Sequence, residues 1–405
     1  MSTTSVAGRQ RTVSSHEQAL AAADTFAESL RGTVIERDRS GELPVAELER
    51  FDASGLAAIT VPDGDGGPEL PMTTLAEVIR RIAAVDPAVA QAPQGHYLMV
   101  DVLAVWGDED QRARLFSEVL AGGRFGNTLA ERGGTHAQDL KTRIMRDAGR
   151  LRLDGRKYYC TGALTSRWLA ASALDDDDRL VLAFVPREAT GVTLDHDWDV
   201  MGQRATVSGG VRYEDVEVDP GLVIDYARVF EVPQQIGARA QLVHAAIEVG
   251  IAGGALDDAR WFVTEKGRPF FEAVRGGWTE TAGGDPHVIQ RFGRLATQVH
   301  AAELVLADAA AVQDAVGRRP ADAEAAARGS VAIARAKAFA SEVAVQVASD
   351  LFSMTGASAA DEKHDLSRHW RNARTHSSHD PVDWKYHHVG NWLLNRVLPP
   401  NHGQL

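Results

Sequence analysis

The sequence of 405 residues contains one cysteine, Cys160, which excludes an internal disulfide framework. Long apolar runs are also missing, since none approaches the roughly 18 residues that a membrane-spanning helix needs. Positive charge is scarce, because 43 Lys and Arg face 56 Asp and Glu and no basic cluster occurs. These deficits argue against a membrane protein or a nucleic-acid-binding protein, and we expect a cytoplasmic enzyme.

A glycine-rich dinucleotide motif is missing as well. No predicted strand is followed by G-x-G-x-x-G and a helix. The segment G-I-A-G-G-A, from Gly250 to Ala255, lies inside an apolar helical pattern, where small residues more often allow two helices to pack closely. The chain therefore lacks the usual means of binding NAD(P)H.

The periodicity of apolar residues divides the chain into four parts. Residues 1–14 form a polar tail that we expect to be mobile. Apolar residues in 15–120 recur at helical spacing, whereas those in 121–234 alternate as they do in strands. Residues 235–405 are rich in alanine and helical, with lengths that suit a four-helix bundle. The sequence thus predicts an α+β fold with a helical domain, a β domain and a helical bundle.

Short polar patterns within these parts predict turns. Asp154-Gly155 stands between two alternating runs, which is typical of a two-residue hairpin turn. The four aspartates of residues 175–178 indicate the exposed tip of another hairpin. The D-x-D-x-G segment of residues 63–67 resembles the start of a calcium loop but lacks the later carboxylates, so we expect a turn without metal.

The stretch from Arg371 to Tyr386 has the most distinctive chemistry. His376 and His379 stand three residues apart, so on a helix or a tight turn they share a face. Asp380-Pro381 reads as an N-cap followed by proline at the first helical position, which would place His379 near the positive end of a helix dipole and favour a neutral imidazole.

Seven of the 14 histidines lie between residues 364 and 402, so a zinc site deserves consideration. The spacing of His376 and His379 could ligate zinc, but no cysteine joins them and we expect no metal. Structural roles at a subunit interface are the interpretation for His387 and His388.

The stretch from Arg371 to Tyr386, together with the helical–β–helical order, resembles the flavin monooxygenases built on the acyl-CoA dehydrogenase fold. The resemblance extends over most of the chain and is nearest to the dibenzothiophene monooxygenases and related sulfur-acquisition oxidoreductases. It implies an N-terminal helical domain, a central β-barrel or sandwich and a C-terminal four-helix bundle, assembled as a homotetramer.

The resemblance also implies a reaction. FMN, reduced by a separate NAD(P)H:flavin reductase, would react with O2 to form a flavin C4a-hydroperoxide that oxygenates a small organosulfur substrate. FAD is less expected, because M-T-G-A-S-A carries one glycine where FAD-dependent members have Q-x-x-G-G-x-G. Oxygenation of an amino-sugar nitrogen or an aromatic carbon stays open, since other branches of the fold perform those reactions.

Matching positions carry the site residues of the resemblance over to this chain. Its flavin contacts fall on Asn127, Thr128, Arg132, Lys157, Tyr158, Tyr159, Cys160, Thr161, Arg268, Ala357, Ser358 and His379. Its catalytic positions fall on His379, His376, Thr161, Asn127 and His96. Its substrate pocket falls on His96, Tyr97 and Trp198, although Gly95 stands where the resembled proteins have a tyrosine. For most of these residues a purely structural role, as a strand end, a turn or a packed side chain, is the alternative.

Two other functions remain possible at this stage. One is an FAD-dependent acyl-CoA dehydrogenase, which needs a carboxylate base for proton abstraction next to a thioester carbonyl. Asp380 stands where that glutamate is often found, but it is one carbon shorter and expected to cap a helix. The other is a scaffold that has kept the fold and binds no flavin.

Overall fold

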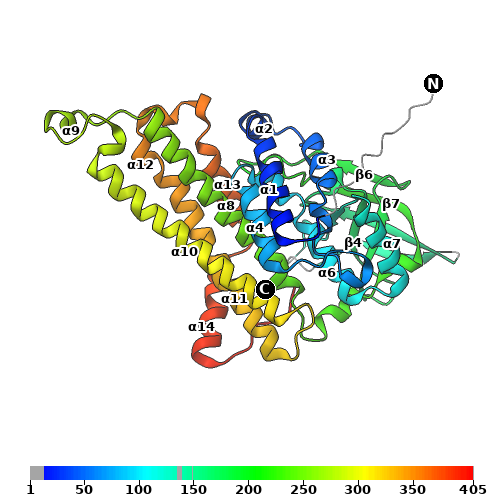
Figure 1. Cartoon of the computed structure of the whole chain (residues 1–405). Coiled ribbons are helices and arrows are strands. Elements are labelled where there is room, and N and C mark those ends of the chain that lie inside the picture. Colours follow the sequence, from blue (N-terminus) through cyan, green and yellow to red (C-terminus); the bar gives the residue numbers. More distant parts are fainter. Residues whose placement is uncertain (1–12, 135–138, 148, 405) are drawn as a thin grey trace, which may run out of the picture.

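The computed structural model describes residues 13–134, 139–147 and 149–404. Most of the predicted tail, residues 1–14, therefore lies outside the described residues. A layer of short helices packs beside a β-sheet, and a bundle of long helices extends away from both (Figure 1). This helical–β–helical order confirms the predicted α+β class. The positions at which separate domains begin and end stay a prediction.

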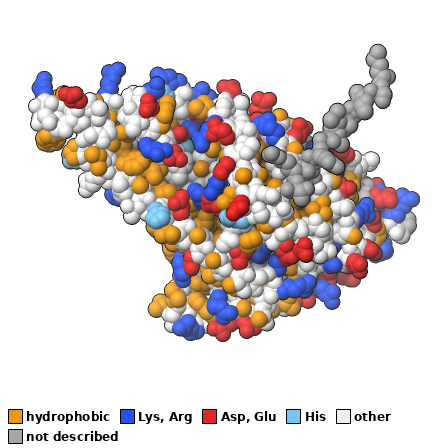
Figure 2. Space-filling view, viewed as in Figure 1, with side chains coloured by type: hydrophobic (Ala, Val, Ile, Leu, Met, Phe, Trp, Pro, Cys, Tyr) orange, Lys and Arg blue, Asp and Glu red, His pale blue; other side chains and the backbone are white. Residues whose placement is uncertain are grey.

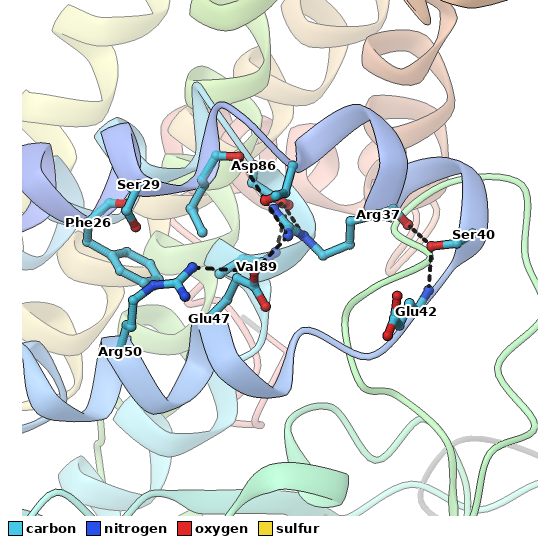
Figure 3. A network of polar contacts seen from close by, with 11 residues as sticks. Phe26, Ser29, Arg37, Ser40, Glu42, Glu47, Arg50, Asp86 and Val89 are labelled. Carbon is cyan, nitrogen blue, oxygen red and sulfur yellow. Dashed lines mark hydrogen bonds and ion pairs between the residues drawn. The ribbon is translucent and has the colours of Figure 1, made fainter.

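The N-terminal layer consists of amphipathic helices that bury one apolar face each. Its helices are α1 (His16–Leu30), α2 (Val34–Ser40), α3 (Val45–Ala53), α4 (Met72–Ala83), α5 (Pro87–Gln91), α6 (Gln94–Trp106) and α7 (Glu109–Leu120). Arg37 of α2 joins three of them through ion pairs of 2.7 Å with Asp86 and 3.1 Å with Glu47 (Figure 3). Asp86 also accepts hydrogen bonds from the first backbone N–H groups of α5. Both oxygens of this buried carboxylate therefore have partners, one in the ion pair and one at the start of the helix.

The central layer is one mixed sheet with the strand order β6-β7-β3-β2-β4-β5-β8, and β1 pairs in parallel with β4. Its strands are β1 (Phe125–Thr128), β2 (Arg143–Asp147), β3 (Arg150–Lys157), β4 (Trp168–Leu174), β5 (Leu180–Pro186), β6 (Val192–Asp195), β7 (Gly210–Val218) and β8 (Val223–Ile224). The aspartates of residues 175–178 form the turn between β4 and β5, which confirms that prediction.

The hairpin predicted at Asp154-Gly155 is wrong. Both residues lie inside β3, where the register with β7 shifts between Leu153 and Gly155. Gly155 has a φ of +154°, and a Cβ there would lie 2.3 Å from Oγ1 of Thr142. Asp-Gly therefore marks a β-bulge with a close backbone approach, a second context in which strands use glycine.

The C-terminal layer is a bundle around three long helices. Its helices are α8 (Ile236–Glu265), α9 (Phe271–Arg275), α10 (Pro286–Val316), α11 (Ala323–Asp350), α12 (Phe352–Thr355), α13 (Ser367–Ser377) and α14 (Val382–Asn395). The small residues of α8 allow α4 to approach, because a Cβ on Gly254 would lie 2.1 Å from the carbonyl oxygen of Ala84. This close contact confirms the packing role predicted for the segment from Gly250 to Ala255.

One buried carboxylate ties the bundle to the rest of the molecule. The carboxylate of Asp101 in α6 lies 2.7 Å from Arg239 of α8 and 2.9 Å from Arg318, which follows α10. Burial opposes ionisation of Asp101, but the two guanidinium groups hold its pKa below the usual range.

Helix α10 is long and apolar enough to cross a membrane by length and composition alone, which sequence inspection missed. In its most apolar window, 33% of the residues are buried inside the structure.

Candidate active site

A cavity of about 970 Å³ lies where the three layers meet. Part of the wall comes from α5, α6 and α8, a second part from the sheet and its loops, and a third from the end of α13 and the segment that follows it. The segment from Asn401 to Gln404 borders the same cavity. Its position is secured by Asn401, whose side-chain amide donates to the carbonyl oxygens of Phe230 at 2.8 Å and Val232 at 2.7 Å.

Polar groups of the sheet layer line one side of this cavity. The Thr161 hydroxyl lies 2.8 Å from the hydroxyl of Ser208, which lies 2.7 Å from that of Thr206. The backbone N–H of Asn127 donates to the carbonyl oxygen of Thr161 at 3.1 Å, so the two predicted flavin contacts lie side by side. Both residues line the cavity, and their contact with flavin stays a prediction.

Two aromatic side chains extend this wall. Tyr159 and Trp198 make an edge-to-face contact with ring centroids 6.1 Å apart, and both line the cavity. The indole N–H of Trp198 donates to the carbonyl oxygen of Gln203 at 2.8 Å, which orients the ring. Trp198, predicted to line the substrate pocket, therefore lies in the cavity wall, and its contact with substrate stays a prediction.

Three imidazoles meet in another part of the cavity wall. Nδ1 of His244, in α8, lies 3.2 Å from Nε2 of His376, and the ring centroid of His244 lies 4.3 Å from that of His379. Sequence reasoning found the pair in the C-terminal stretch but missed His244. Nothing in its own helix marks it, because its partners are more than 130 residues away in the chain.

Burial determines the protonation state of two of these imidazoles. Burial, with help from the nearby charges of His379 and Lys337, holds the pKa of His244 well below its usual range. Burial and Lys337 likewise hold the pKa of His376 well below its usual range. These two imidazoles are therefore neutral near pH 7, each with one N–H donor and one acceptor nitrogen. In the described part of the chain no three His, Cys, Asp or Glu side chains are arranged to hold a metal ion.

Asp380 does not cap the next helix, so that expectation is wrong. Helix α14 begins at Val382, with Pro381 at its N-cap position. The carboxylate of Asp380 instead lies 2.6 Å from Nζ of Lys385 and 3.4 Å from Nδ1 of His379. Burial favours the neutral acid, but the hydrogen bond with His379 and the charge of Lys385 hold the pKa of Asp380 well below its usual range.

Two predicted substrate contacts lie in the core instead of the cavity wall. His96 is fully buried, with Nε2 2.8 Å from the carbonyl oxygen of Ala57 and Nδ1 accepting the backbone N–H of Phe125 at 3.2 Å. Burial lowers its pKa to about 4. The Tyr97 hydroxyl donates to the carbonyl oxygen of Leu56 at 2.9 Å. Each side chain satisfies backbone groups inside the helical layer and is not among the residues that line the cavity.

Several predicted flavin contacts stand behind the sheet-side wall. Lys157 is buried and makes an ion pair of 2.7 Å with Glu131, which itself lines the cavity. Arg132 lies over the rings of Tyr158 and Tyr159 at 4.8 Å and 4.9 Å. The remaining two, Thr128 and Cys160, are buried in the sheet layer. Of this group only Tyr159 lines the cavity directly.

The predicted phosphate contacts lie elsewhere in the subunit. Arg268 follows the C-terminal end of α8, and Ala357 with Ser358 follows α12, at the far end of the bundle (Figure 1). None of the three lines the cavity. A single copy of the chain therefore does not bring them to the same site as Thr161.

Five glutamines in the cavity wall were not singled out from the sequence. They are Gln91, Gln94, Gln203, Gln241 and Gln404. Their helical or loop positions carry no local signal, and only the fold turns them toward one space.

The sheet-side wall fits a flavin ring. Tyr159 and Trp198 offer aromatic surface, and the hydroxyl of Thr161 offers a hydrogen bond. Both polar atoms of the Gln203 side chain are buried without a partner among the described residues, which a polar ring edge would satisfy.

Comparisons with known proteins agree with this fold. Models described as the N-terminal, middle and C-terminal domains of acyl-CoA dehydrogenase match residues 14–123, 128–216 and 242–384. The probable FMNH2-dependent monooxygenase SfnC of Pseudomonas putida is 32% identical, over 94% of this chain and 96% of that protein.

Solved structures give the same result. The FMN-bound structure of TdsC from Paenibacillus sp. A11-2, a dibenzothiophene monooxygenase, is 29% identical with a TM-score of 0.90, over 96% of this chain and 100% of that one. Methanesulfinate monooxygenase MsuC of Pseudomonas fluorescens is 30% identical with a TM-score of 0.87, over 95% of this chain and 99% of that one.

Proposed function

The chain belongs to the acyl-CoA dehydrogenase family, and on this premise we propose that it is the oxygenase component of a two-component, FMNH2-dependent monooxygenase acting on organosulfur compounds. The single observation that carries the proposal is that a cluster of three imidazoles, two of them buried and neutral, lines the same cavity as the aromatic and hydroxyl groups of the sheet-side wall. The similarity to SfnC, TdsC and MsuC supports the same chemistry.

FMN is the cofactor that the site and the relatives support. Thr161 and Asn127 would hold the polar edge of its ring, with Tyr159 and Trp198 beside it. When bound in its reduced form, FMN supplies the two electrons with which one atom of O2 is transferred to substrate and the other becomes water. A separate NAD(P)H:flavin reductase is the proposed source of these electrons, since the chain has no dinucleotide motif of its own.

The histidines have the task of holding and returning a proton next to the flavin. A neutral imidazole can donate a hydrogen bond from one nitrogen and accept a proton at the other. His376 is buried and held by His244, whereas the side chain of His379 is 43% exposed and borders the cavity. We assign proton transfer to His379 and a positioning role to His376 and His244. Filling of the cavity by flavin and substrate would exclude water and limit the loss of oxygen as hydrogen peroxide.

A homotetramer in the cytoplasm is the proposed assembly. Apolar side chains gather on the bundle half of the molecule (Figure 2) and include the exposed Trp278, Phe270 and Ile289. A second copy that covers this surface would bring its Arg268 and its loop at Ala357 and Ser358 toward a neighbouring cavity. That arrangement would give the FMN phosphate the contacts that one subunit lacks.

The acyl-CoA dehydrogenase alternative has less support from the geometry. Asp380 is engaged by Lys385 at 2.6 Å and is held ionised, so it is not an available base of raised pKa. A flavin-free scaffold would leave the side chain of Gln203 buried without a partner.

The experiment that tests the proposal measures coupling. The chain, FMN, a flavin reductase and NADH are mixed with a thioether, and oxygenated product and hydrogen peroxide are quantified against O2 consumed. We expect product to dominate in the native protein. In His379→Ala we expect FMN affinity within a few-fold of native and peroxide as the main product, whereas His300→Ala, an exposed histidine of α10, should behave as native. Unchanged coupling in His379→Ala would remove the role assigned to this residue.

A further inference from the structure

Helix α13 and the loop of residues 196–209, between β6 and β7, contact each other directly, and both contribute to the cavity wall. A Cβ on Gly202 would lie 2.0 Å from the carbonyl oxygen of Arg371, so the two backbones pack without space for a side chain. The guanidinium group of Arg371 also donates to the carbonyl oxygen of Met201 at 3.2 Å. The loop is therefore packed tightly against one turn of the helix.

A buried hydrogen bond joins the helix to the loop. Oδ1 of Asn372 accepts the backbone N–H of Gln203 at 2.5 Å. Both residues are 3% exposed, so bulk water does not replace this acceptor. Gln203 has a φ of +55°, a left-handed conformation that residues other than glycine adopt only at an energetic cost. The bond to Asn372 therefore stabilises a strained backbone position.

From Gln203 the hydrogen bonds continue into the part of the wall that is proposed to bind flavin. The carbonyl oxygen of Gln203 accepts the indole N–H of Trp198 at 2.8 Å and the hydroxyl of Thr206 at 3.1 Å. The hydroxyl of Thr206 is joined through that of Ser208 to the hydroxyl of Thr161. The placement of Trp198 and Thr161 thus depends on where the backbone of Gln203 is held.

The same asparagine is tied to the imidazoles by its own helix. His376 stands one turn after Asn372 in α13, so the two side chains share a face. The backbone N–H of His379 donates to the carbonyl oxygen of His376 at 3.1 Å, and the ring of His376 contacts that of His244. A shift of the loop along α13 would therefore change the distance between the flavin-side wall and the histidines.

We propose that Asn372 is a positioning residue, which sets the distance between the flavin-side wall and the histidines through its hydrogen bond to the backbone of Gln203. This inference rests on the proposed monooxygenase function and adds a residue that is not among those lining the cavity. Proton transfer requires hydrogen-bond distance between the two heavy atoms, and a misplacement of about 1 Å can cost about 100-fold in rate.

Hydrogen–deuterium exchange of the flavin-free protein tests the contact itself. Asn372→Leu keeps the approximate size of the side chain and removes the acceptor, whereas Asn372→Asp keeps an acceptor oxygen. Exchange in residues 198–208, followed by mass spectrometry, should be about tenfold faster in Asn372→Leu and within about twofold of native in Asn372→Asp. Asn395→Ala, which changes an exposed asparagine of α14, is the matched control and should exchange as native.

Coupling tests the positioning role. Each protein is mixed with saturating FMN, a flavin reductase, NADH and either tetrahydrothiophene or dibenzothiophene, and hydrogen peroxide is quantified against O2 consumed. Peroxide per O2 should rise about threefold or more in Asn372→Leu and return to the native value in Asn372→Asp. Combining Asn372→Leu with His379→Ala should give the value of His379→Ala alone, because Asn372 acts through the histidines. Saturating FMN removes the effect of weaker flavin binding.

A second variant perturbs the same contact from the loop. Gly202→Ala leaves Asn372 in place, but its Cβ would displace the loop from α13. It should therefore raise both exchange and peroxide release as Asn372→Leu does. This variant keeps the inference testable if Asn372→Leu does not fold.

The outcomes separate the inference from the function. Native exchange of residues 198–208 in both Asn372→Leu and Gly202→Ala would overturn the inference. Faster exchange with native peroxide release would also overturn it, since the bond would then be structural only, and so would additive peroxide release when Asn372→Leu and His379→Ala are combined. If the native protein oxygenates neither probe while exchange behaves as expected, the proposed function fails and the contact between α13 and the loop stands.

Discussion

Replacing Glu248 by glutamine should change how the stability of the protein depends on pH. Glu248 lies one turn after His244 in α8, is fully buried, and has both carboxylate oxygens without a hydrogen-bond partner among the described residues. Burial raises its pKa from 4.5 to about 8, and Lys337 opposes this only in part. Burial also lowers the pKa of Lys337, so both members of the pair are driven toward their neutral forms.

The sign of the effect follows from linkage. A carboxyl group whose pKa is higher in the folded state than in the unfolded state holds its proton longer when folded. Its stabilising contribution is complete below pH 4.5 and is lost as the pH rises through about 8. One such proton gives a slope of at most about 1.4 kcal/mol per pH unit, and the whole window corresponds to at most about 4–5 kcal/mol. Pairing of ionised Glu248 with Lys337 will reduce that figure.

Urea unfolding at fixed protein concentration between pH 5 and pH 9 measures the effect. The native protein should lose stability across the window, and Glu248→Gln should lose about 1 kcal/mol less per pH unit and be the more stable protein at pH 9. Glu324→Gln, on the exposed start of α11, is the control and should follow the native curve. The reasoning is refuted if Glu248→Gln is destabilised by about 3 kcal/mol or more at pH 6 and keeps the native slope, because that result indicates an ionised, paired carboxylate.

Three further perturbations test the packing, a buried charge and the assembly. Gly254→Ala should cost about 1–3 kcal/mol in urea unfolding because its Cβ meets a backbone carbonyl, whereas Gly253→Ala, with open space around its Cβ, should stabilise α8 by about 0.5–1 kcal/mol. Asp101→Asn should cost about 3–5 kcal/mol at pH 7, since two arginines lose their partner, and the cost should shrink on acidification as the native carboxylate is protonated below pH 4. Arg268→Ala should weaken FMN binding at least tenfold in the assembled protein, measured by fluorescence quenching, and an unchanged affinity would contradict its role at a neighbouring phosphate.

The fold could be predicted from the sequence because its signals are repeated along the chain. Helical spacing, strand alternation and the small residues of α8 each recur over many positions, so single errors do not change the result. Local sequence signals that have two physical explanations gave the wrong predictions. Asp154-Gly155 suits a hairpin turn and a β-bulge equally well, and Asp380 can cap a helix or pair with Lys385.

The site could be predicted only where its residues lie close in the chain. His376 and His379 form a visible pair, and Thr161 ends a strand pattern. His244 and Gln241 join them only because α8 packs against α13, and no sequence spacing encodes that contact. His96 shows the converse, since a histidine in a matching segment can be used entirely for backbone hydrogen bonds in the core.

Incorporation of labelled oxygen tests the central claim most directly. The chain is mixed with FMN, a flavin reductase, NADH and ¹⁸O2, with tetrahydrothiophene and its 1-oxide as substrates, and the products are analysed by mass spectrometry. The proposed function predicts one labelled oxygen atom for each oxygenation step, dependent on reduced FMN and reduced in His379→Ala. Product without label, or no product together with oxidation of an acyl-CoA thioester by FAD-loaded protein, would contradict it.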